Sequence, residues 1–186
     1  MSATVNTRRG TNDIVQQLVR VARAVEVSPG VKAFDRVEWF DSEVLEDAFR
    51  YLLISEKAVC VVVMLDESFE MVLEGPKGCI TRRLPVGLLI SDRVLGSRQK
   101  ALSGDGAAVV GAMGLMELLL PAVSGELLAP RPGPPQTARV VVEPKSVGVM
   151  SVRDTEKKLA GRVSVCLEVD CVGGRVEWQL AKGPAL

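Results

Sequence analysis

The spacing of apolar residues in the first third of the chain predicts two amphipathic helices. Over residues 13–26 the apolar positions recur every three or four residues, between a Thr-Asn-Asp capping cluster and the helix-stopping Ser-Pro-Gly at 28–30. Residues 41–57 show the same spacing, and the Asp-Ser pair that opens them can cap a helix. Each helix has one apolar face, so we expect both helices to pack on a sheet.

Strand patterns lie between and after these helices. Residues 31–40 alternate imperfectly between apolar and polar positions. Residues 58–65 (AVCVVVML) form a continuous β-branched run, which is typical of a central strand buried on both faces. Residues 69–73 predict a weaker strand, and the Gly-Pro-Lys-Gly at 75–78 predicts a turn or loop.

The middle of the chain combines a strand, a loop and an apolar helix. Residues 83–93 predict a strand with Pro85 near its start or at a sheet edge, where a missing N–H is tolerated. Residues 96–106 predict a loop, and residues 107–120 predict a helix that is apolar over most of its surface. Pro121 cannot donate to the carbonyl four residues earlier, so we expect the helix to kink there or to end just before it.

A proline-rich segment, residues 129–136 (APRPGPPQ), precedes the C-terminal strands. Four prolines in eight residues favour extended polyproline geometry. We interpret the segment as a stiff crossover loop; the alternative is a ligand for the aromatic groove of a partner. Residues 137–143 and 146–152 then predict strands, and the charged run at 153–158 predicts a solvated loop.

The last patterned segment predicts an antiparallel hairpin. Residues 162–172 alternate as a half-buried strand does, Gly173-Gly174 has the composition of a tight turn, and residues 175–180 can return as the hairpin partner. The elements together predict an α+β fold: a mixed, largely antiparallel sheet with about three helices packed on one face and a C-terminal β-hairpin. We expect the other face of the sheet to be polar or to contact another subunit.

The length of the chain sets its domain organisation. At 186 residues it is long enough for one core and too short for two ordinary domains. We expect a flexible N-terminal arm over residues 1–10, a single α+β domain over residues 11–180 and a flexible C-terminal tail over residues 181–186.

Composition and charge narrow the classes of function. The chain has no histidine, so it lacks the commonest general base and metal ligand and any Ser-His or Cys-His nucleophile pair. Lys plus Arg equals Asp plus Glu at 23 each, which argues against a broad cationic surface for nucleic acid. We therefore expect a protein that is not an enzyme and that carries no catalytic residue, metal or cofactor.

The four cysteines and the apolar runs indicate where the protein is made. The cysteines, at positions 60, 79, 166 and 171, lack the C-x2-C spacing of zinc sites and thioredoxin-like motifs. We interpret them as buried, reduced thiols of a cytosolic protein. No secretory leader pattern opens the sequence and no apolar run approaches membrane-spanning length, so we expect assembly in a cytoplasm and no membrane contact.

A glycine-rich stretch invites comparison with phosphate-binding loops. The pattern G-x-G-x-x-G begins at Gly104 but has Val109 in place of its third glycine. The P-loop pattern matches through Gly111, but Ala112 and Met113 stand where Lys and Ser or Thr are required. Small residues at these positions more simply allow a tight turn and close helix packing.

Basic residues concentrate in and around the segment from residue 82 to residue 100. One interpretation is docking against an acidic ring of a neighbouring protein; the second is a solvated strand edge and loop, and direct DNA contact ranks third. The candidates for an assembly interface are Arg82, Arg83, Arg93, Arg98, Gln99 and Lys100.

The order of these elements resembles that of the phage tail terminator proteins, which close the end of a tail tube and join it to the head. The resemblance rests on an N-terminal helix, an apolar central strand, a strand that ends in an Arg-containing loop, a Gly-opened helix, a Pro-containing loop and closing strands. The matching segments are residues 13–26, AVCVVVML at 58–65, VGLLISDRVLGSRQKALSGDG at 86–106, VGAMGLMELLLPAVSGELL at 110–128, APRPGPP at 129–135 and VSVCLEVDCVG at 163–173.

The resemblance implies a structural role in a virion. It implies a homo-hexameric ring on the last ring of the tail tube protein, which stops tail polymerisation and presents the interface to the head. The implied partners are the tail tube protein, a neck or connector protein and, as a further partner, a sheath protein, with DNA only as cargo in the lumen. The alternatives are another phage neck, connector or baseplate protein, a nucleic-acid-binding module, and a small carboxylate- or Cys-dependent enzyme.

Overall fold

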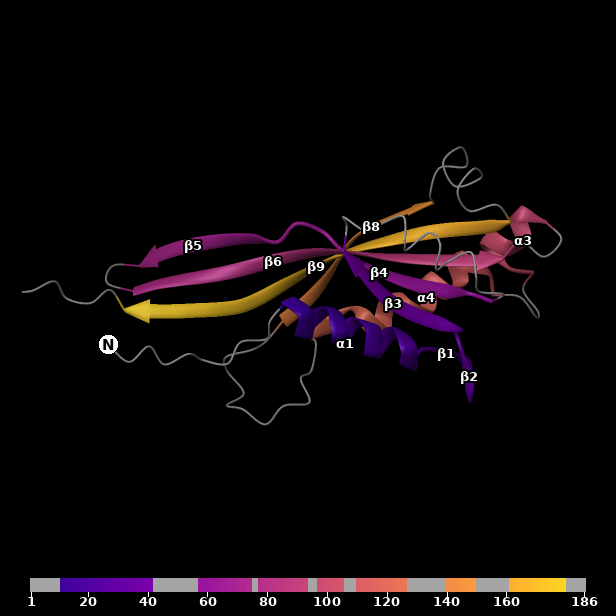
Figure 1. The fold of residues 1–186 in the computed structure, drawn as a ribbon, viewed down its shortest axis with the longest axis horizontal. Coiled ribbons are helices and arrows are strands. Elements are labelled where there is room, and N and C mark those ends of the chain that lie inside the picture. Colours follow the sequence, from indigo (N-terminus) through magenta and orange to yellow (C-terminus); the bar gives the residue numbers. More distant parts are fainter. Residues whose placement is uncertain are drawn as a thin grey trace, which may run out of the picture.

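The computed structural model places one large sheet at the centre of the molecule, with helices on one side of it (Figure 1). The structure describes residues 11–41, 57–74, 77–93, 97–105, 110–126, 140–149 and 161–179. The expected flexible ends at 1–10 and 181–186, the Pro-rich segment at 129–136 and the charged run at 153–158 lie outside these residues. So does residue range 42–56, which holds nearly all of the second predicted helix.

Seven strands form the large sheet, and the only parallel pair among them joins β3 to β4. The strands, in sheet order, are β3 (Arg36–Asp41), β4 (Val59–Met64), β6 (Lys77–Arg93), β9 (Arg162–Gln179), β8 (Val140–Val149) and β7 (Gly125–Glu126), with β5 (Ser68–Glu74) also paired to β6. A separate two-stranded sheet joins β1 (Glu26–Ser28) to β2 (Val31–Lys32). The predicted α+β class and the mixed, largely antiparallel sheet are confirmed.

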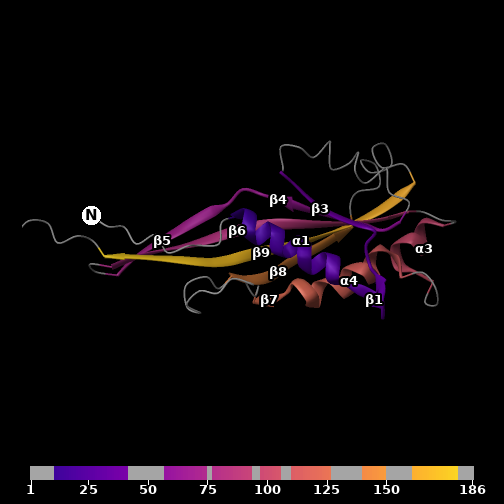
Figure 2. The same ribbon diagram turned by 60° about the horizontal axis from the view of Figure 1, so that its bottom comes forward.

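Three helices, α1 (Thr11–Ala24), α3 (Arg98–Ser103) and α4 (Gly111–Val123), pack on the sheet. Figure 2 shows α1 and α4 on the same side of it. Ile14 and Leu18 of α1, Leu115 and Leu119 of α4, and Leu88 of β6 belong to one buried cluster, each at most 4% exposed. The main core therefore fills the space between this face of the sheet and the helices, because both surfaces are apolar there.

The opposite face of the sheet is apolar at β4. Val59, Val61 and Val63 alternate with the core residues of the same strand and form a second buried cluster with Leu89 of β6. The continuous apolar run at 58–65 follows from this burial on both faces, as predicted.

The predicted hairpin turn at Gly173-Gly174 is wrong, because β9 continues through it to Gln179. Ile80 pairs with Val176 and Arg82 pairs with Gly173, so β9 uses three residue steps where β6 uses two. The extra residue is a β-bulge, and Gly173 accepts its φ of 150° because it lacks a Cβ. The C-terminal hairpin of the fold is formed instead by β7 and β8, which pair antiparallel.

Pro85 lies in the interior of β6, not near its start or at a sheet edge. On one side of β6, β5 ends its pairing at Arg83 and β4 begins its pairing at Val86. The Pro85 carbonyl accepts a hydrogen bond from the Leu65 backbone N–H at this junction. The Pro85 nitrogen faces the same side, between the two partner strands, where no ladder hydrogen bond is lost.

Two helix predictions need correction. Residues 98–103 of the predicted loop form α3, whose first turn is capped by Ser97 Oγ, an acceptor for the Lys100 N–H at 3.2 Å. Helix α4 runs past Pro121 to Val123, so it does not end before the proline. Pro121 lies in the last turn of the helix and is exposed.

Two strand boundaries also differ from prediction. The segment at 31–40 is divided into β2 and β3, because Ala33 and Phe34 turn into the core between them. The strands expected at 137–143 and 146–152 are one strand, β8, with a register shift between Pro144 and Ser146.

Three strands project from the body of the molecule as an arm (Figures 1 and 2). We define the arm as residues 68–74 of β5, 77–83 of β6 and 173–179 of β9. The partner strands β4 and β8 pair with the other ends of β6 and β9, so within the described residues β5, β6 and β9 alone form the arm.

Candidate assembly surfaces

The six residues predicted as interface candidates lie in two separate places. Arg82 and Arg83 lie where the arm joins the body, whereas Arg93 ends β6 and residues 98–100 open α3. Ten residue steps of extended strand separate Arg83 from Arg93, or about 33 Å. The basic segment of the sequence therefore does not form one basic patch.

The two arginines at the arm base are held by acidic residues of the same chain. Arg82 is 9% exposed, and its Nη1 lies 3.2 Å from Glu67 Oε1, just before β5. Arg83 Nη1 donates to Asp170 Oδ2 of β9 at 3.0 Å. These pairs join the three strands of the arm at its root, so Arg82 belongs to the interior of the arm base and not to an open surface.

The other candidates lie at the opposite end of β6. Arg93, Gln99 and Lys100 are exposed, and Arg98 is half-buried. Next to them, Asp92 accepts a hydrogen bond from the Arg93 N–H at 2.8 Å. Burial raises the pKa of the Asp92 carboxyl, and this effect exceeds the lowering by the Arg93 N–H and by the charge of Arg162.

A buried polar cluster near this end was not predicted. Arg162, 4% exposed, donates from Nε to Ser91 Oγ at 3.0 Å and from Nη2 to the carbonyls of Ser91 and Lys57 at 2.9 and 2.7 Å. Ser164 Oγ also donates to Ser91 Oγ at 3.0 Å. The face of β9 that was predicted to be polar is therefore buried at Arg162 and Ser164. The hydrogen bonds of these two residues connect β9 to the end of β6 and to Lys57, just before β4.

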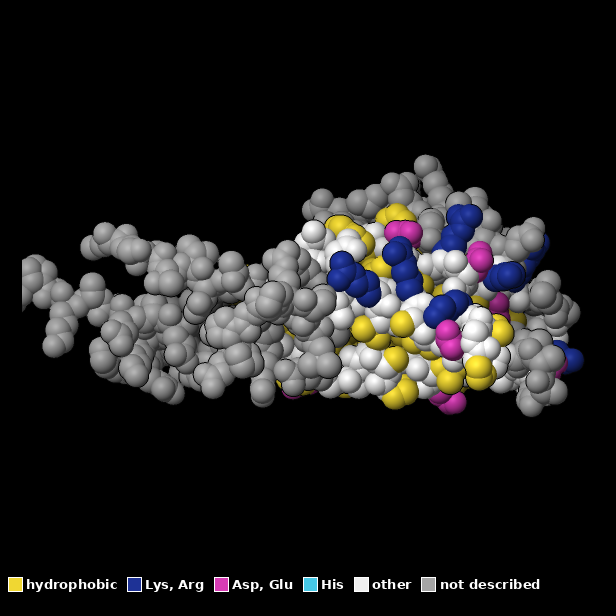
Figure 3. All heavy atoms as spheres, turned by 90° about the horizontal axis from the view of Figure 1, so that it is seen from below, with side chains coloured by type: hydrophobic (Ala, Val, Ile, Leu, Met, Phe, Trp, Pro, Cys, Tyr) yellow, Lys and Arg dark blue, Asp and Glu magenta, His cyan; other side chains and the backbone are white. Residues whose placement is uncertain are grey.

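Charged side chains of both signs are scattered over the described part of the underside of the molecule as Figure 1 is drawn (Figure 3). Exposed Arg20 and Arg23 come from α1, Lys32 from β2 and Arg36 from β3. The acidic residues Glu26, Asp35 and Glu38 lie among these cations in the sequence, and two of the cations pair with acids: Arg23 with Glu38 at 3.3 Å and Lys32 with Glu26 at 2.8 Å. The surface is mixed, which is unlike the single-sign surface that binds nucleic acid.

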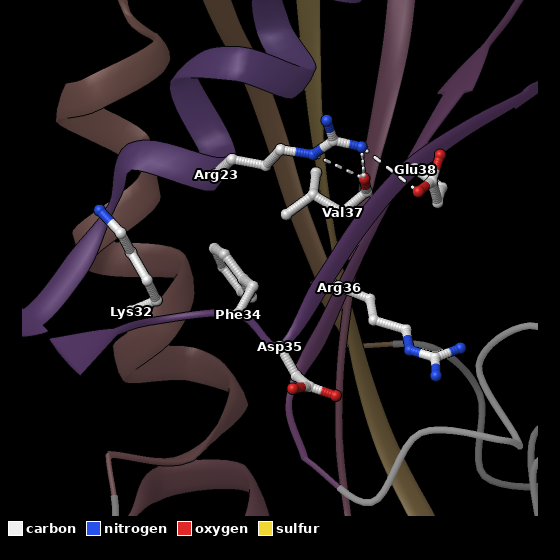
Figure 4. A pocket seen from close by; sticks show the side chains of 7 residues that line it. All are labelled: Arg23, Lys32, Phe34, Asp35, Arg36, Val37 and Glu38. Atoms are coloured by element: carbon white, nitrogen blue, oxygen red, sulfur yellow. Dashed lines mark hydrogen bonds and ion pairs between the residues drawn. The ribbon is translucent and has the colours of Figure 1, made fainter.

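A cavity of about 450 Å³ lies between the end of α1 and strand β3 (Figure 4). Arg23 Nε and Nη2 donate to the Val37 carbonyl at 3.2 and 2.8 Å, so the guanidinium holds α1 against β3. In Figure 4 the side chain of Lys32 points away from the guanidinium of Arg23. The side chain of Arg36 also points away from Arg23. Arg23 pairs with Glu38, and the side chains of Lys32 and Arg36 point away from this pair, whereas a binding or catalytic site requires several polar groups that converge on one point.

The described residues offer little chemistry. No group of three metal-binding residues occurs within the described part of the chain, and none of its helices is long and apolar enough to cross a membrane. Burial raises the pKa of the thiols of Cys60 and Cys171 to about 12 and that of Cys166 to about 11. These three thiols are therefore protonated at neutral pH and are poor nucleophiles.

The glycine-rich stretch has a packing role at Gly111. This residue opens α4 with a φ of 71°, and a Cβ built on it would lie 2.3 Å from the Gly104 nitrogen and 2.9 Å from the Leu102 carbonyl oxygen. Glycine therefore lets the end of α3 meet the start of α4 backbone to backbone. The other positions of the proposed phosphate loop, 106–109, lie outside the described residues.

Helix α4 is apolar on its outward side as well as on its buried side. We define its outer face as Val110, Leu118, Pro121 and Ala122, which are exposed and follow helical spacing. Glu117 is the one charged residue on the exposed side of this helix. A helix that is apolar all round is expected to be buried on all sides, whereas the outer face of α4 is exposed.

The register of the arm pairs apolar positions of the sequence across its three strands. Phe69 pairs with Arg82, Met71 pairs with Ile80, and Leu73 pairs with Gly78. On the other side of β6, Ile80 pairs with Val176 and Gly78 pairs with Trp178. Phe69, at the base of the arm, is 65% exposed.

The bulge at Gly173 lies between two sets of apolar positions in β9. The buried apolar positions of β9 in the body are odd-numbered, from Val163 to Cys171, whereas Val176 and Trp178 are even-numbered. One inserted residue shifts the alternation of the strand by one, and the bulge lies between these two sets of positions.

Compared with known proteins, the sequence matches no protein-family model, and no curated protein shows significant similarity to it.

Proposed function

We propose that this chain is a structural virion protein of the tail-terminator type. It forms a ring of about six copies on the last ring of the tail tube, stops tail polymerisation and provides the interface to the head or neck. It acts at the head-proximal end of the tail after assembly in the host cytoplasm, and it needs no cofactor. DNA passes through the ring as cargo.

The observation that carries this proposal is the exposure of apolar side chains at two separate places on one subunit. Phe69 is exposed at the base of the arm, and Leu118 is exposed on the outer face of α4. A head-to-tail ring needs two different complementary surfaces on each subunit, whereas a pocket enzyme needs convergent polar groups. The order of elements that resembles the tail terminators supports the same reading.

A tube-length assay tests the proposal. The chain is added to the polymerising tail tube protein of its phage, and tube lengths are measured by negative-stain electron microscopy. We expect shorter tubes that carry one extra ring at one end, because a terminator removes the growing surface. Tubes of unchanged length without end rings, at saturating amounts of the chain, would refute the terminator role.

The exposed end of β6 supplies a second prediction. The double variant Arg93→Glu, Arg98→Glu reverses the charge next to α3, and we expect it to lose ring docking in the tube assay while its thermal unfolding stays unchanged. Arg20→Glu, on the exposed side of α1, is the matched control. If the double variant docks as well as the control does, this end of β6 is not part of the interface.

A further inference from the structure

We propose that the base of the arm is an ionic latch that holds a hinge between the arm and the body of the molecule. When the latch is broken, the arm opens as one unit while the body stays folded. This device belongs to the single chain, and it does not rest on the proposed virion role.

The strand β6 loses its regular pairing at both edges within one short stretch. On one edge, pairing with β5 ends at Arg83 and pairing with β4 begins at Val86. On the other edge, the register with β9 shifts between Ile80 and Arg82, opposite the bulge at Gly173. A ladder that is interrupted at both edges of one strand divides the sheet into two cooperative units, and the smaller unit is the arm.

Two ion pairs span this interruption, one on each face of the sheet. Arg82 and Arg83 are successive residues of β6, so their side chains point to opposite faces. Arg82 Nη1 lies 3.2 Å from Oε1 of Glu67, which lies in the connection between β4 and β5. Arg83 Nη1 lies 3.0 Å from Oδ2 of Asp170, in the part of β9 that pairs with β8 in the body. Bending of the arm toward one face separates the pair on the other face, so the two pairs together resist motion in both directions.

The burial of the first pair makes it the stronger half of the latch. The side chains of Arg82 and Glu67 are 11% and 20% exposed. Removal of the Glu67 charge leaves the Arg82 charge buried without it in the closed arm, and opening of the arm brings Arg82 into water. The Arg83 side chain is 56% exposed, so its pair with Asp170 is screened by water and contributes less.

Hydrogen–deuterium exchange of the native chain, followed by mass spectrometry, tests the latch. In the unaltered chain we expect the amides of residues 77–83 to exchange faster than those of residues 59–64, in the body. Glu67→Gln keeps the size of the side chain and removes its charge. We expect this variant to exchange its arm amides about tenfold faster or more, with the body amides unchanged.

A second variant and a control separate the two faces and the two parts of the molecule. Asp170→Asn weakens the pair on the other face, and we expect arm exchange to rise by about two- to fivefold. Glu38→Gln breaks the exposed pair with Arg23 in the body and leaves the latch intact. Arm exchange in this control should stay within about twofold of the unaltered chain.

Three results would overturn the proposal. In the first, the arm and body amides of the unaltered chain exchange at the same rate, so that the arm is not a separate unit. In the second, Glu67→Gln speeds exchange in the arm and the body by the same factor, as global unfolding predicts. In the third, arm exchange in both latch variants equals that of the Glu38→Gln control.

Discussion

At the scale of single residues, the buried Arg162 is the most consequential polar side chain of the sheet. It donates hydrogen bonds to Ser91 Oγ and to the carbonyls of Ser91 and Lys57. Burial lowers the pKa of its guanidinium, against the raising effect of Asp92. The side chain stays charged at every physiological pH, so its hydrogen bonds have to offset the cost of burying that charge.

We expect Arg162→Met to lower the free energy of unfolding by about 2–4 kcal/mol, because Ser91 and the Lys57 carbonyl lose their buried donors. Urea unfolding followed by circular dichroism measures the change. Arg93→Met is the matched control, since Arg93 is the cross-strand partner of Arg162 but is exposed. It should change the free energy of unfolding by about 0.5 kcal/mol or less. Equal effects of the two variants would contradict the structural role of Arg162.

The raised pKa of Asp92 predicts a pH dependence of stability. A carboxyl whose pKa is higher in the folded state binds its proton more tightly there, so ionisation costs folding free energy as the pH rises above about 4. Asp92→Asn removes this cost. The stability gain of the variant over the unaltered chain should therefore be larger at about pH 7 than at about pH 3.5. A gain that is the same at both values, or larger at the lower one, would contradict the assignment.

The sequence gives few signs of these residue roles. Arg162 and Ser164 alternate with valines exactly as solvent-facing residues of a half-buried strand do, so the pattern alone assigns them to the surface. Their burial depends on which segments pack over the strand, and this is a long-range property. The basic residues from Arg82 to Lys100 lie in two separate places for a related reason: neighbours in sequence lie far apart when a strand is fully extended.

At the scale of elements, the contact between α3 and α4 depends on glycine. We expect Gly111→Ala to destabilise the protein by about 2 kcal/mol or more, because a left-handed φ costs about 1–2 kcal/mol and the new Cβ meets backbone atoms. Thermal or urea unfolding measures the loss.

A second glycine separates backbone strain from crowding. Gly30 has a similar φ of 79° but nothing within 4 Å of a built Cβ, so Gly30→Ala should cost only the strain, about 1–2 kcal/mol. Equal losses for the two alanine variants would show that the close approach at Gly111 contributes nothing.

Elements with strong local signals were predicted well, and those set by pairing partners were not. The apolar run at 58–65, the amphipathic pattern of α1 and the alternation of β9 each define their element locally. Pro85 and Gly173-Gly174 have the composition of strand-breaking positions, yet β6 and β9 run through both. Pro85 is tolerated because its nitrogen faces a junction between two partner strands, and the glycines because a bulge needs their conformational freedom.

At the scale of the whole molecule, the proposed function requires a subunit that contacts copies of itself. The fold class was predictable because helical and strand periodicities report it directly. The arm and the open side of α4 were not predictable, because they depend on where helices stop covering a long sheet. The proposed ring follows from these two surfaces together with the resemblance to tail terminators.

The mass of the unaltered chain in solution tests the central claim most directly. Light scattering over a concentration series, with negative-stain images of the same samples, gives the number of copies and the symmetry of the particle. The proposed function predicts closed rings of about six copies, in equilibrium with single chains at low concentration. The mass of the particle should then be about six times the 20.0 kDa of one chain. A particle of 20.0 kDa at every concentration, with no rings in the images, would contradict it.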